Sequence, residues 1–464
     1  MAAEPGDGRL VTELLTGWGR TAPSRASVAR PAHLGEVHAL LGGPPGRGAI
    51  ARGLGRSYGD AAQCAGGTVI DVTGLAKVRS FDGERGLVRV DAGLSLGDLT
   101  RLVLPLGWFP PVLPGTRHVT VGGAVAADIH GKNHHVDGSF CDHVEGFTLL
   151  TPTGTVEVTP DSEPDLFWAT AGGMGLTGVV AEVSIRLQPV ETAFVRVDTE
   201  RALDLDDALA RMEEGDHRYR YSVAWIDCLA RGASLGRAVL TRGGHAALDE
   251  LPDKVRPKAL HGEPKLVGTA PPWAPPGLLN HASVRAFNSA WFHKAPSLER
   301  GRLQPLHRFF HPLDAVEGWN RVYGARGFVQ YQFVVPLGQE RALAHAVERL
   351  SATRCPSFLA VLKRFGGHNH GPLSFPMAGW TLALDLQVGP PQVGPVLDEL
   401  DEVVAEAGGR VYLAKDARLR PELLPVMYPR LHEWRRVQAK VDPAGVLRSD
   451  LDRRLGLVER QGVG

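Results

Sequence analysis

Cysteine and lysine are scarce in this 464-residue chain, and neither sign of charge is in excess. Lys+Arg and Asp+Glu both number 51, so the formal net charge is zero. A nucleic-acid partner is not expected, because proteins that neutralise phosphates carry a basic excess. The four cysteines have no C-x-x-C spacing, which indicates reduced packing thiols rather than a zinc site or a disulfide framework. Only nine lysines occur, so their positions are informative.

Long apolar runs are also missing. No stretch approaches the roughly 18 apolar residues of a membrane-spanning helix, and Met1–Arg9 is polar and glycine-rich rather than a basic start followed by an apolar core. We therefore expect no signal peptide and no transmembrane helix. The protein is expected to be soluble or peripherally associated with the cytoplasmic or periplasmic face of a membrane. The apolar content of 43% is ordinary for a globular protein, and this length predicts two domains.

Small residues, by contrast, are concentrated in Pro114–His135, which reads P-G-T-R-H-V-T-V-G-G-A-V-A-A-D-I-H-G-K-N-H-H. Glycine and alanine let a backbone approach a flat or charged group closely. The histidines and the lysine at the end of the stretch could hold a negatively charged or reacting group. We interpret Pro114–His135 as lying against a flavin and leading into its active site; close helix packing is the alternative.

A second glycine-rich loop lies in Arg47–Asp60, R-G-A-I-A-R-G-L-G-R-S-Y-G-D. It lacks the context of a dinucleotide fingerprint, because its third glycine is out of register and the strand Thr68–Val72 follows in place of an apolar helix. A glycine loop between two strands can still bind a pyrophosphate through backbone N–H groups, and a plain hairpin loop is the alternative. Gly172–Gly178 forms a third glycine-rich segment.

A separate unit is expected after Pro189, where the composition changes. Its periodicity predicts a mainly antiparallel sheet with helices on one face. Leu251–Ala295 is rich in proline and tryptophan and lacks clear periodicity, which is typical of a functional lid or a disordered segment. The elements expected beyond it are strands at 328–335, 357–363, 380–387 and 410–415, and helices at 340–351, 395–407, 424–436 and 442–450.

The three glycine-rich segments, followed by a separate sheet unit and a short C-terminal return, resemble the vanillyl-alcohol-oxidase-type FAD-binding superfamily. Over essentially its whole length the chain is similar to one family within it, the decaprenylphosphoryl-β-D-ribose 2′-oxidases. The segments that carry this resemblance are A-R-G-L-G-R-S-Y-G-D, V-L-P-G-T-R-H-V-T-V-G-G-A-V-A-A-D-I-H-G-K-N-H-H, G-L-T-G, Q-Y-Q-F, P-L-S-F-P and Y-L-A-K-D.

The resemblance implies an α+β, two-domain PCMH-type FAD-binding fold with an inserted substrate domain built on an antiparallel sheet flanked by helices. The FAD-binding domain would comprise residues 1–194 and return at 410–464, and the substrate-binding domain would comprise residues 195–409. FAD would be held noncovalently. The residues implied in binding it are Ala51, Arg52, Gly53, Leu54, Gly55, Arg56, Ser57, Tyr58, Gly59, Asp60, Ala61, Gly115, Thr120, Val121, Gly122, Gly123, Ala127, Asp128, Ile129, His130, Val180, Tyr412 and Lys415.

The same resemblance implies catalytic and substrate-binding residues. A cation beside the flavin would stabilise the negative charge that develops on reduction, and a lysine whose pKa is lowered by burial can take a proton. The ordinary alternatives are a solvated surface charge for each lysine and core packing for Tyr323. The residues implied in catalysis are Lys415, Lys132, Tyr58 and Gln332. Those implied in binding the substrate are Gln330, Tyr323, Lys363, Trp225 and His130.

The histidines of Pro114–His135 allow two other interpretations. In several superfamily members a histidine binds the flavin covalently, but the resembled family holds FAD noncovalently, so we predict no covalent bond at His130. A metal site is not expected either, because His130, His134 and His135 have no carboxylate or cysteine at suitable spacing.

One departure from the family lies in the strand expected at 380–387. Mycobacterial members carry an asparagine and a cysteine where this chain has Thr381 and Ala383. A thiol is not required for hydride transfer. We predict that inhibitors acting by capture of that thiol bind this protein only reversibly.

The function implied is FAD-dependent oxidation of the 2′-hydroxyl of a polyprenylphosphoryl ribose. A quinone-like acceptor and a separate short-chain reductase would complete the epimerisation to an arabinose donor for the cell wall. A lipid tail could run along Leu251–Ala295. The alternatives are a soluble sugar-alcohol or aldonolactone oxidase and a flavin-binding partner subunit without turnover.

Overall fold

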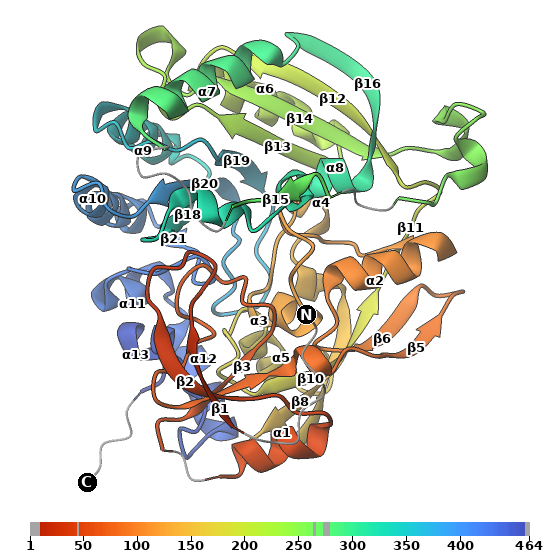
Figure 1. Ribbon diagram of the computed structural model, residues 1–464, viewed down its shortest axis with the longest axis vertical. Helices are drawn as coiled ribbons and strands as arrows, with labels where there is room; N and C mark the ends of the chain where they lie inside the picture. The colour runs from red at the N-terminus through yellow and green to blue at the C-terminus, as the bar shows by residue number, and fades with distance from the viewer. Residues whose placement is uncertain (1–9, 44–45, 263–265, 272–278, 460–464) are drawn as a thin grey trace.

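Two parts make up the molecule, one above the other in Figure 1. The computed structural model describes residues 10–43, 46–262, 266–271 and 279–459. The lower part contains two sheets together with the C-terminal helices, and the upper part is built on one large sheet. The fold is α+β, as predicted.

The first sheet of the lower part has four strands in the order β1-β2-β4-β3. They are β1 (Val11–Leu15), β2 (Ser24–Ala29), β4 (Thr68–Asp71) and β3 (Ala49–Arg52), with α1 (Leu34–Leu41) connecting β2 toward β3. Strand β4 pairs in parallel with both β2 and β3. The glycine loop that follows β3 therefore leaves the carboxyl end of this parallel set, the edge at which ligands commonly bind.

The second sheet of the lower part has five antiparallel strands in the order β5-β6-β10-β8-β9. They are β5 (Val78–Asp82), β6 (Leu87–Asp91), β10 (Val179–Arg186), β8 (Val144–Thr151) and β9 (Gly154–Val158). The accompanying elements are α2 (Leu96–Val103), β7 (Trp108–Phe109), α3 (Val121–Ala126), α4 (His134–Asp137), α5 (Pro164–Thr170) and β11 (Gln188–Pro189). Helix α3, which carries the run of small residues, packs against β6 and β10.

The upper sheet has eight strands, and every neighbouring pair is antiparallel. In spatial order they are β16 (Leu298–Pro305), β12 (Phe194–Ala202), β14 (Ala238–His245), β13 (Tyr221–Ile226), β19 (Ala360–Phe365), β20 (Gly379–Gln387), β18 (Phe328–Pro336) and β21 (Arg410–Val411). Its helices are α6 (Leu205–Gly215), α7 (His281–Lys294), α8 (Leu306–Phe310), α9 (Glu340–Ala352) and α10 (Val393–Glu406). The predicted antiparallel sheet flanked by helices is confirmed.

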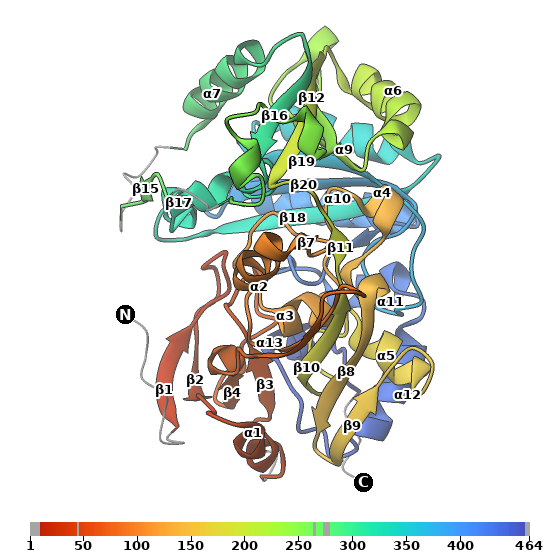
Figure 2. The same cartoon turned by 90° about the vertical axis from the view of Figure 1, so that its right-hand side faces the viewer.

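Alternate residues of the central strands face opposite ways, because side chains in a strand have a period of two. Phe333, Leu362, Leu382 and Leu384 are fully buried and belong to one core cluster with α9 and α10. The other face of the same strands is turned toward the lower part. Figure 2 shows the lower part of the molecule beneath β18. This second face carries the polar residues of the candidate site.

After β21 the chain returns to the lower part through α11 (Leu424–Met427), α12 (Leu431–Val441) and α13 (Asp450–Leu455). Helix α12 packs against α5, and the two views show these helices beside the first sheets. Strand β21 itself belongs to the upper sheet. The boundaries 1–194, 195–409 and 410–464 remain predictions.

Four expected elements differ from the structure. The helix expected at 424–436 is interrupted at Pro429, since α11 ends at Met427 and α12 begins at Leu431. The strand expected at 410–415 ends at Val411, because the chain turns there toward the lower part. The helix expected at 442–450 is wrong, since α13 begins only at Asp450. Leu251–Ala295 contains the helix α7, capped by Asn280, and the short strand β15 (Gly268–Thr269), which pairs with β17 (Val316–Glu317). Residues 263–265 and 272–278 of that stretch lie outside the described residues.

The longest helices of the described residues, α7 and α10, have 14 residues each. Among those residues, no helix combines the length and the apolar character needed to cross a membrane.

Candidate functional site

The polar face of the upper sheet brings together residues that are distant in sequence. Gln330 pairs with Asp385, Gln332 with Ala383, and Lys363 with Thr381. Paired residues of an antiparallel ladder point to the same side of the sheet. All six side chains therefore lie on one face, opposite the helices α9 and α10.

His130 lies where this face meets the lower part. Its Nε2 is 3.0 Å from Nε2 of Gln332, and its ring packs among the rings of Phe365, Phe375 and Tyr412. The amide group of Gln332 must donate, so Nε2 of His130 accepts and the proton of the neutral ring is on Nδ1. Burial, reinforced by Lys363, holds the pKa of His130 well below its usual value. Nδ1 is buried and has no partner among the described residues.

Lys132 and Lys363 stand beside His130 on either side of the junction. Nζ of Lys132 donates to the carbonyl oxygen of Phe309 and lies 4.2 Å from the centre of the Phe309 ring. Nζ of Lys363 donates to the carbonyl oxygen of Gly131 at 3.5 Å. Neither lysine has a carboxylate within ion-pair distance in the described structure. Removal from solvent lowers the pKa of Lys132 to about 7 and that of Lys363 to about 8, and Lys363 contributes to the shift at Lys132.

Lys415 reaches the same region from the segment after β21. The backbone N–H of Tyr412 donates to the carbonyl of Gln332 at 2.9 Å, and the Tyr412 hydroxyl donates to the carbonyl of Ala127 at 2.8 Å. These bonds tie the segment to both parts of the molecule. Nζ of Lys415 lies 3.9 Å from the centre of the Tyr58 ring. Burial lowers the pKa of Lys415 to about 7, partly opposed by Asp385 and reinforced by Lys363.

Asp385 is a residue of this site that the sequence interpretation missed. It is fully buried and accepts hydrogen bonds from Nε2 of Gln330 at 2.5 Å and from the hydroxyl of Tyr323 at 3.0 Å. Burial raises the pKa of this carboxyl to about 7. A signal existed in the sequence: an aspartate between two leucines in a central strand is rarely buried without a specific partner.

The glycine loop after β3 has the features of an anion cradle. The backbone N–H groups of Leu54, Gly55, Arg56 and Ser57 have no hydrogen-bond partner in the described part of the chain. Gly55 has φ +63°, and successive N–H groups that converge around such a residue bind anions. A Cβ added at Gly115 would meet no atom within 4 Å, so this residue borders open space. The unpartnered N–H groups of this loop therefore fit the pyrophosphate of FAD.

Comparison with known proteins identifies the family. Residues 26–159 match a family described as FAD binding domain, and residues 389–455 match one described as D-arabinono-1,4-lactone oxidase. A decaprenylphosphoryl-beta-D-ribose oxidase of Mycolicibacterium smegmatis is 44% identical over 453 residues, which cover 96% of this chain and 98% of that protein. This chain belongs to the decaprenylphosphoryl-β-D-ribose oxidase family.

Two further relatives are similar to parts of the chain. An uncharacterized protein of Streptomyces coelicolor is 44% identical over 373 residues, 78% of this chain and all of that protein. The human Delta(24)-sterol reductase is 28% identical over 145 residues, which cover 31% of this chain and 28% of that protein. As a member of this family with an FAD-binding domain, the chain is an FAD-dependent oxidoreductase that acts on a CH–OH group.

Several residues that the family resemblance assigns to FAD have side chains engaged within the protein. Arg52 donates to the carbonyls of Ala62 and Thr16, and Arg56 donates to that of His118. Such residues could contact FAD only through their backbones or the free remainder of their side chains. Their role in binding FAD remains a prediction.

Asp128 shows the same pattern at the end of α3. It is fully buried, has φ +38°, and accepts hydrogen bonds from Ser374 at 2.5 Å, Asn369 at 2.7 Å and the N–H of Cys141 at 3.1 Å. These bonds tie the end of α3 to the P-L-S-F-P segment. The carboxylate of Asp128 therefore has a structural task here.

Close packing explains two glycines for which a cofactor contact was the preferred interpretation. A Cβ at Gly122 would lie 2.8 Å from that of Ala92, and one at Gly53 would lie 2.2 Å from Oγ1 of Thr120. That hydroxyl caps α3 by accepting from the N–H of Gly123 at 3.2 Å. Glycine at 53 and 122 is thus required by the protein's own packing.

The remaining substrate-binding predictions are distributed unevenly. Trp225 is on the polar face, next to Val361, but its indole N–H donates to the carbonyl of Phe358 at 3.0 Å. Tyr323 stacks on Phe328 at 4.1 Å between ring centres, so core packing and the bond to Asp385 both apply. The later histidines contact backbone groups: Nδ1 of His134 accepts from the N–H of Gly366, and Nε2 of His135 lies 2.9 Å from the carbonyl of Tyr219.

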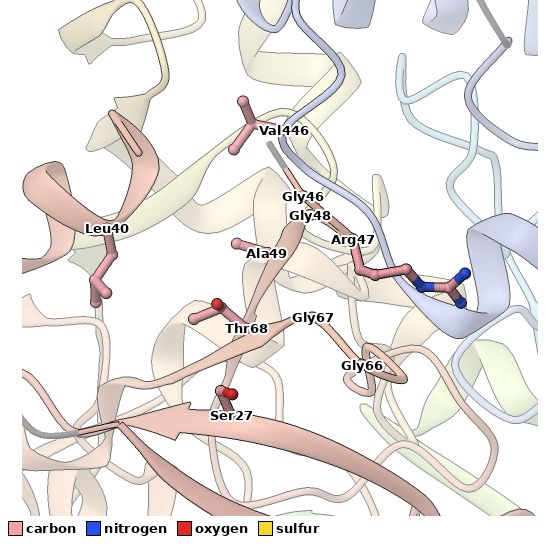
Figure 3. Close-up of a pocket in the computed structure, with 10 residues that line it drawn as sticks. All are labelled: Ser27, Leu40, Gly46, Arg47, Gly48, Ala49, Gly66, Gly67, Thr68 and Val446. Carbon is pink, nitrogen blue, oxygen red and sulfur yellow. The ribbon is translucent and has the colours of Figure 1, made fainter. Parts of the chain in front are cut away.

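A cavity of about 200 Å³ lies at the other end of β3 from the glycine loop. Figure 3 shows that its lining is mostly backbone and small side chains. Nε of Arg47 donates to the carbonyl of Ala65 at 3.1 Å. The cavity lies apart from the three lysines and is not part of the candidate site. Within the described ranges, no group of three or more His, Cys, Asp or Glu residues could hold a metal ion.

Proposed function

We propose that this chain oxidises the 2′-hydroxyl of decaprenylphosphoryl-β-D-ribose to a ketone, the first step of an epimerisation that yields the arabinose donor of cell-wall arabinan. Family membership supports the substrate. The observation that carries the chemistry is that Lys132, Lys363 and Lys415, largely removed from solvent, surround a polar sheet face beside the glycine-rich segments. Bound FAD would supply the acceptor for the hydride that leaves the carbon of the alcohol.

Lys415 is the group proposed to take the hydroxyl proton. A base works best when its pKa is close to the working pH, and burial brings the pKa of Lys415 to about 7. A large fraction of Lys415 is then neutral at neutral pH, with Nζ free to accept a proton. Asp385 lies on the same face and would stabilise the ammonium group that results.

Lys132 and Lys363 are proposed to hold the phosphate of the substrate. Each presents a cation that has no carboxylate partner, and a phosphate would replace the solvation that both have lost. The arriving negative charge would raise the pKa of both lysines and keep them protonated. Gln332 and His130 lie at the same junction and are proposed to contact the sugar, with the Nδ1–H of His130 as a free donor.

FAD is proposed to be held noncovalently. The side chain of His130 supports this proposal, because Nε2 is occupied by the hydrogen bond from Gln332 and the ring is packed among three aromatic residues. Denaturation should release all flavin from the polypeptide. Flavin absorbance that stays with the protein after acid precipitation would disprove noncovalent binding.

The proposal extends to the partners of the reaction. A quinone-like acceptor would reoxidise the cofactor, and a separate short-chain reductase would reduce the ketone on the opposite face. Peripheral contact with a membrane would give access to the lipid-linked substrate. The similarity to the Mycolicibacterium smegmatis oxidase supports the lipid-linked sugar alone.

A second candidate is a soluble aldonolactone oxidase, favoured by the match of residues 389–455, which include Lys415, to D-arabinono-1,4-lactone oxidase. Anaerobic titration of the holoenzyme separates the candidates. Bleaching of the flavin by polyprenylphosphoryl ribose, and not by free sugars or lactones, is expected. Bleaching by a free lactone alone would replace the proposal, and no bleaching by either would indicate a flavin-binding subunit without turnover.

A further inference from the structure

Helix α13 joins two segments that meet at the candidate flavin site. Arg454 donates from Nε and Nη2 to the two carboxylate oxygens of Asp60, at 3.0 and 2.8 Å. Its Nη1 donates to Oδ2 of Asp416 at 2.8 Å. Asp60 ends the glycine loop and Asp416 directly follows Lys415. One guanidinium group therefore connects the proposed pyrophosphate loop with the segment that carries the proposed base.

Both carboxylates depend on this guanidinium. Asp60 is 8% exposed and Asp416 is 4% exposed, so neither is well solvated. The other oxygen of Asp416, Oδ1, accepts from the N–H groups of Arg418 and Leu419 at 2.9 and 2.8 Å. A planar guanidinium can serve two carboxylates at once, which a lysine ammonium does less well. Loss of Arg454 would leave two buried negative charges uncompensated.

The two segments are also in direct backbone contact. The N–H of Tyr58 donates to the carbonyl of Ala414 at 3.0 Å. A Cβ at Gly59 would lie only 1.9 Å from the carbonyl oxygen of Asp416, so the approach requires glycine. These contacts set the Tyr58 ring beneath Nζ of Lys415. A shift of either segment would change that arrangement.

We propose that Arg454 is a positioning residue that clamps the glycine loop against the Lys415 segment, and so fixes the pyrophosphate cradle and the proposed base relative to each other. The catalytic consequence rests on the proposed function, whereas the clamp itself does not depend on any substrate. In the described structure Arg454 makes no hydrogen bond with Tyr58 or Lys415, so it acts through Asp60 and Asp416.

The test compares Arg454→Met, Arg454→Lys and the control Arg435→Met. Arg435 also bonds the C-terminal region, but its ion pair with Glu459 is exposed. Amide hydrogen exchange on the apoprotein should rise in residues 53–60 and 412–417 of Arg454→Met and stay unchanged there in Arg435→Met. The Kd for FAD should rise about tenfold to a hundredfold in Arg454→Met, the range for losing charge-assisted hydrogen bonds, with Arg454→Lys intermediate.

Kinetics at saturating FAD adds a second readout. In Arg454→Met, kcat should fall about tenfold while KM for polyprenylphosphoryl ribose changes little, because the phosphate-binding lysines are not on the clamped segments. Should Arg454→Met fail to fold, Asp416→Asn breaks the same contact and keeps Oδ1 as an acceptor. The clamp would be overturned if hydrogen exchange and FAD affinity were unchanged in both Arg454→Met and Asp416→Asn. It would also be overturned if Arg435→Met changed exchange and FAD affinity as much as Arg454→Met does. Absence of turnover in the unmodified enzyme would count against the proposed function only.

Discussion

Replacement of Asp385 by asparagine tests the proposed coupling between a carboxyl and the base Lys415. Asparagine has nearly the same shape, so the change removes negative charge from the site with little change of volume. Of the two hydrogen bonds that Gln330 and Tyr323 donate to the carboxylate, the amide oxygen can accept one, and the amide NH2 group faces the other donor. At most one donor is left unsatisfied, which costs about 1–3 kcal/mol. A domain stabilised by about 5–15 kcal/mol remains folded after such a loss.

The expected functional effect follows from the sign of the interaction. Asp385 raises the pKa of Lys415 against the larger lowering caused by burial, and the net value is about 7. Without that negative charge, the pKa of Lys415 should fall by about 0.5–1.5 units, since one unit corresponds to about 1.4 kcal/mol of interaction. The rise of kcat/KM with pH, which reports deprotonation of Lys415 in the free enzyme, should move to lower pH.

The assay is the pH profile of kcat/KM between about pH 5 and 9, measured for the unmodified enzyme and for Asp385→Asn. Asp401→Asn is the matched control, because Asp401 is also a fully buried acid but pairs with Arg418 behind the sheet. Its profile should keep the midpoint of the unmodified enzyme. A midpoint for Asp385→Asn that is unchanged, or that moves to higher pH, would refute the assignment of Lys415 as the base that Asp385 controls.

Three further predictions concern other residues of the site. Lys132→Met should raise KM for polyprenylphosphoryl ribose about tenfold or more with a smaller change in kcat, because it removes a phosphate-binding cation. An equal loss of kcat/KM on a substrate without phosphate would contradict this role. Ala383→Cys should place a thiol opposite Gln332, where mycobacterial members have one. Mass spectrometry of this variant after treatment with a thiol-capturing inhibitor should find an adduct within residues 380–386. An adduct within the same residues of the unmodified protein would contradict reversible binding. Lys415→Met should stabilise the apoprotein by about 1–3 kcal/mol at pH 6 and by much less above pH 10. The reason is that a lysine whose pKa is lowered in the folded state destabilises the fold at low pH, and this destabilisation disappears as the pH rises from about 7 through the pKa of the unfolded state. Urea unfolding at the two pH values measures the effect, and a stabilisation that grows with pH would contradict the prediction.

The sequence predicted the parts of this molecule whose signals are local. Alternation of apolar residues in 328–335 and 380–387 indicated strands, and both form in the centre of the upper sheet. The helix α7 was missed although Val284, Phe287, Trp291 and Phe292 recur at helical spacing. The proline-rich run before Asn280 obscured this spacing, and of the four residues Val284 and Phe292 are buried, whereas Phe287 and Trp291 are exposed.

Prediction of the site depended on the family resemblance for identity and on the structure for contacts. The scarcity of lysine directed attention to Lys132, Lys363 and Lys415, and the structure brings all three to one region. Asp385 could not be chosen by spacing, because its importance comes from partners on β18 and near residue 323 that only the tertiary fold brings close. The glycines at 53 and 122 are also needed for packing within the protein, so their role in binding FAD stays a prediction.

The position of α13 also determines when the site can form as the chain is synthesised. Arg454 reaches Asp60 across 394 positions, and Ser24 donates to Asp450 across 426. Contacts with such large sequence separation close long loops and form late in folding. The glycine loop and α3 leave the ribosome early, but the loop remains without its distant partner until Arg454 has been made. Completion of the candidate flavin site therefore waits until α13 has been made, and truncation before α13 would yield a chain that contains every glycine-rich segment and still lacks the contact that joins them.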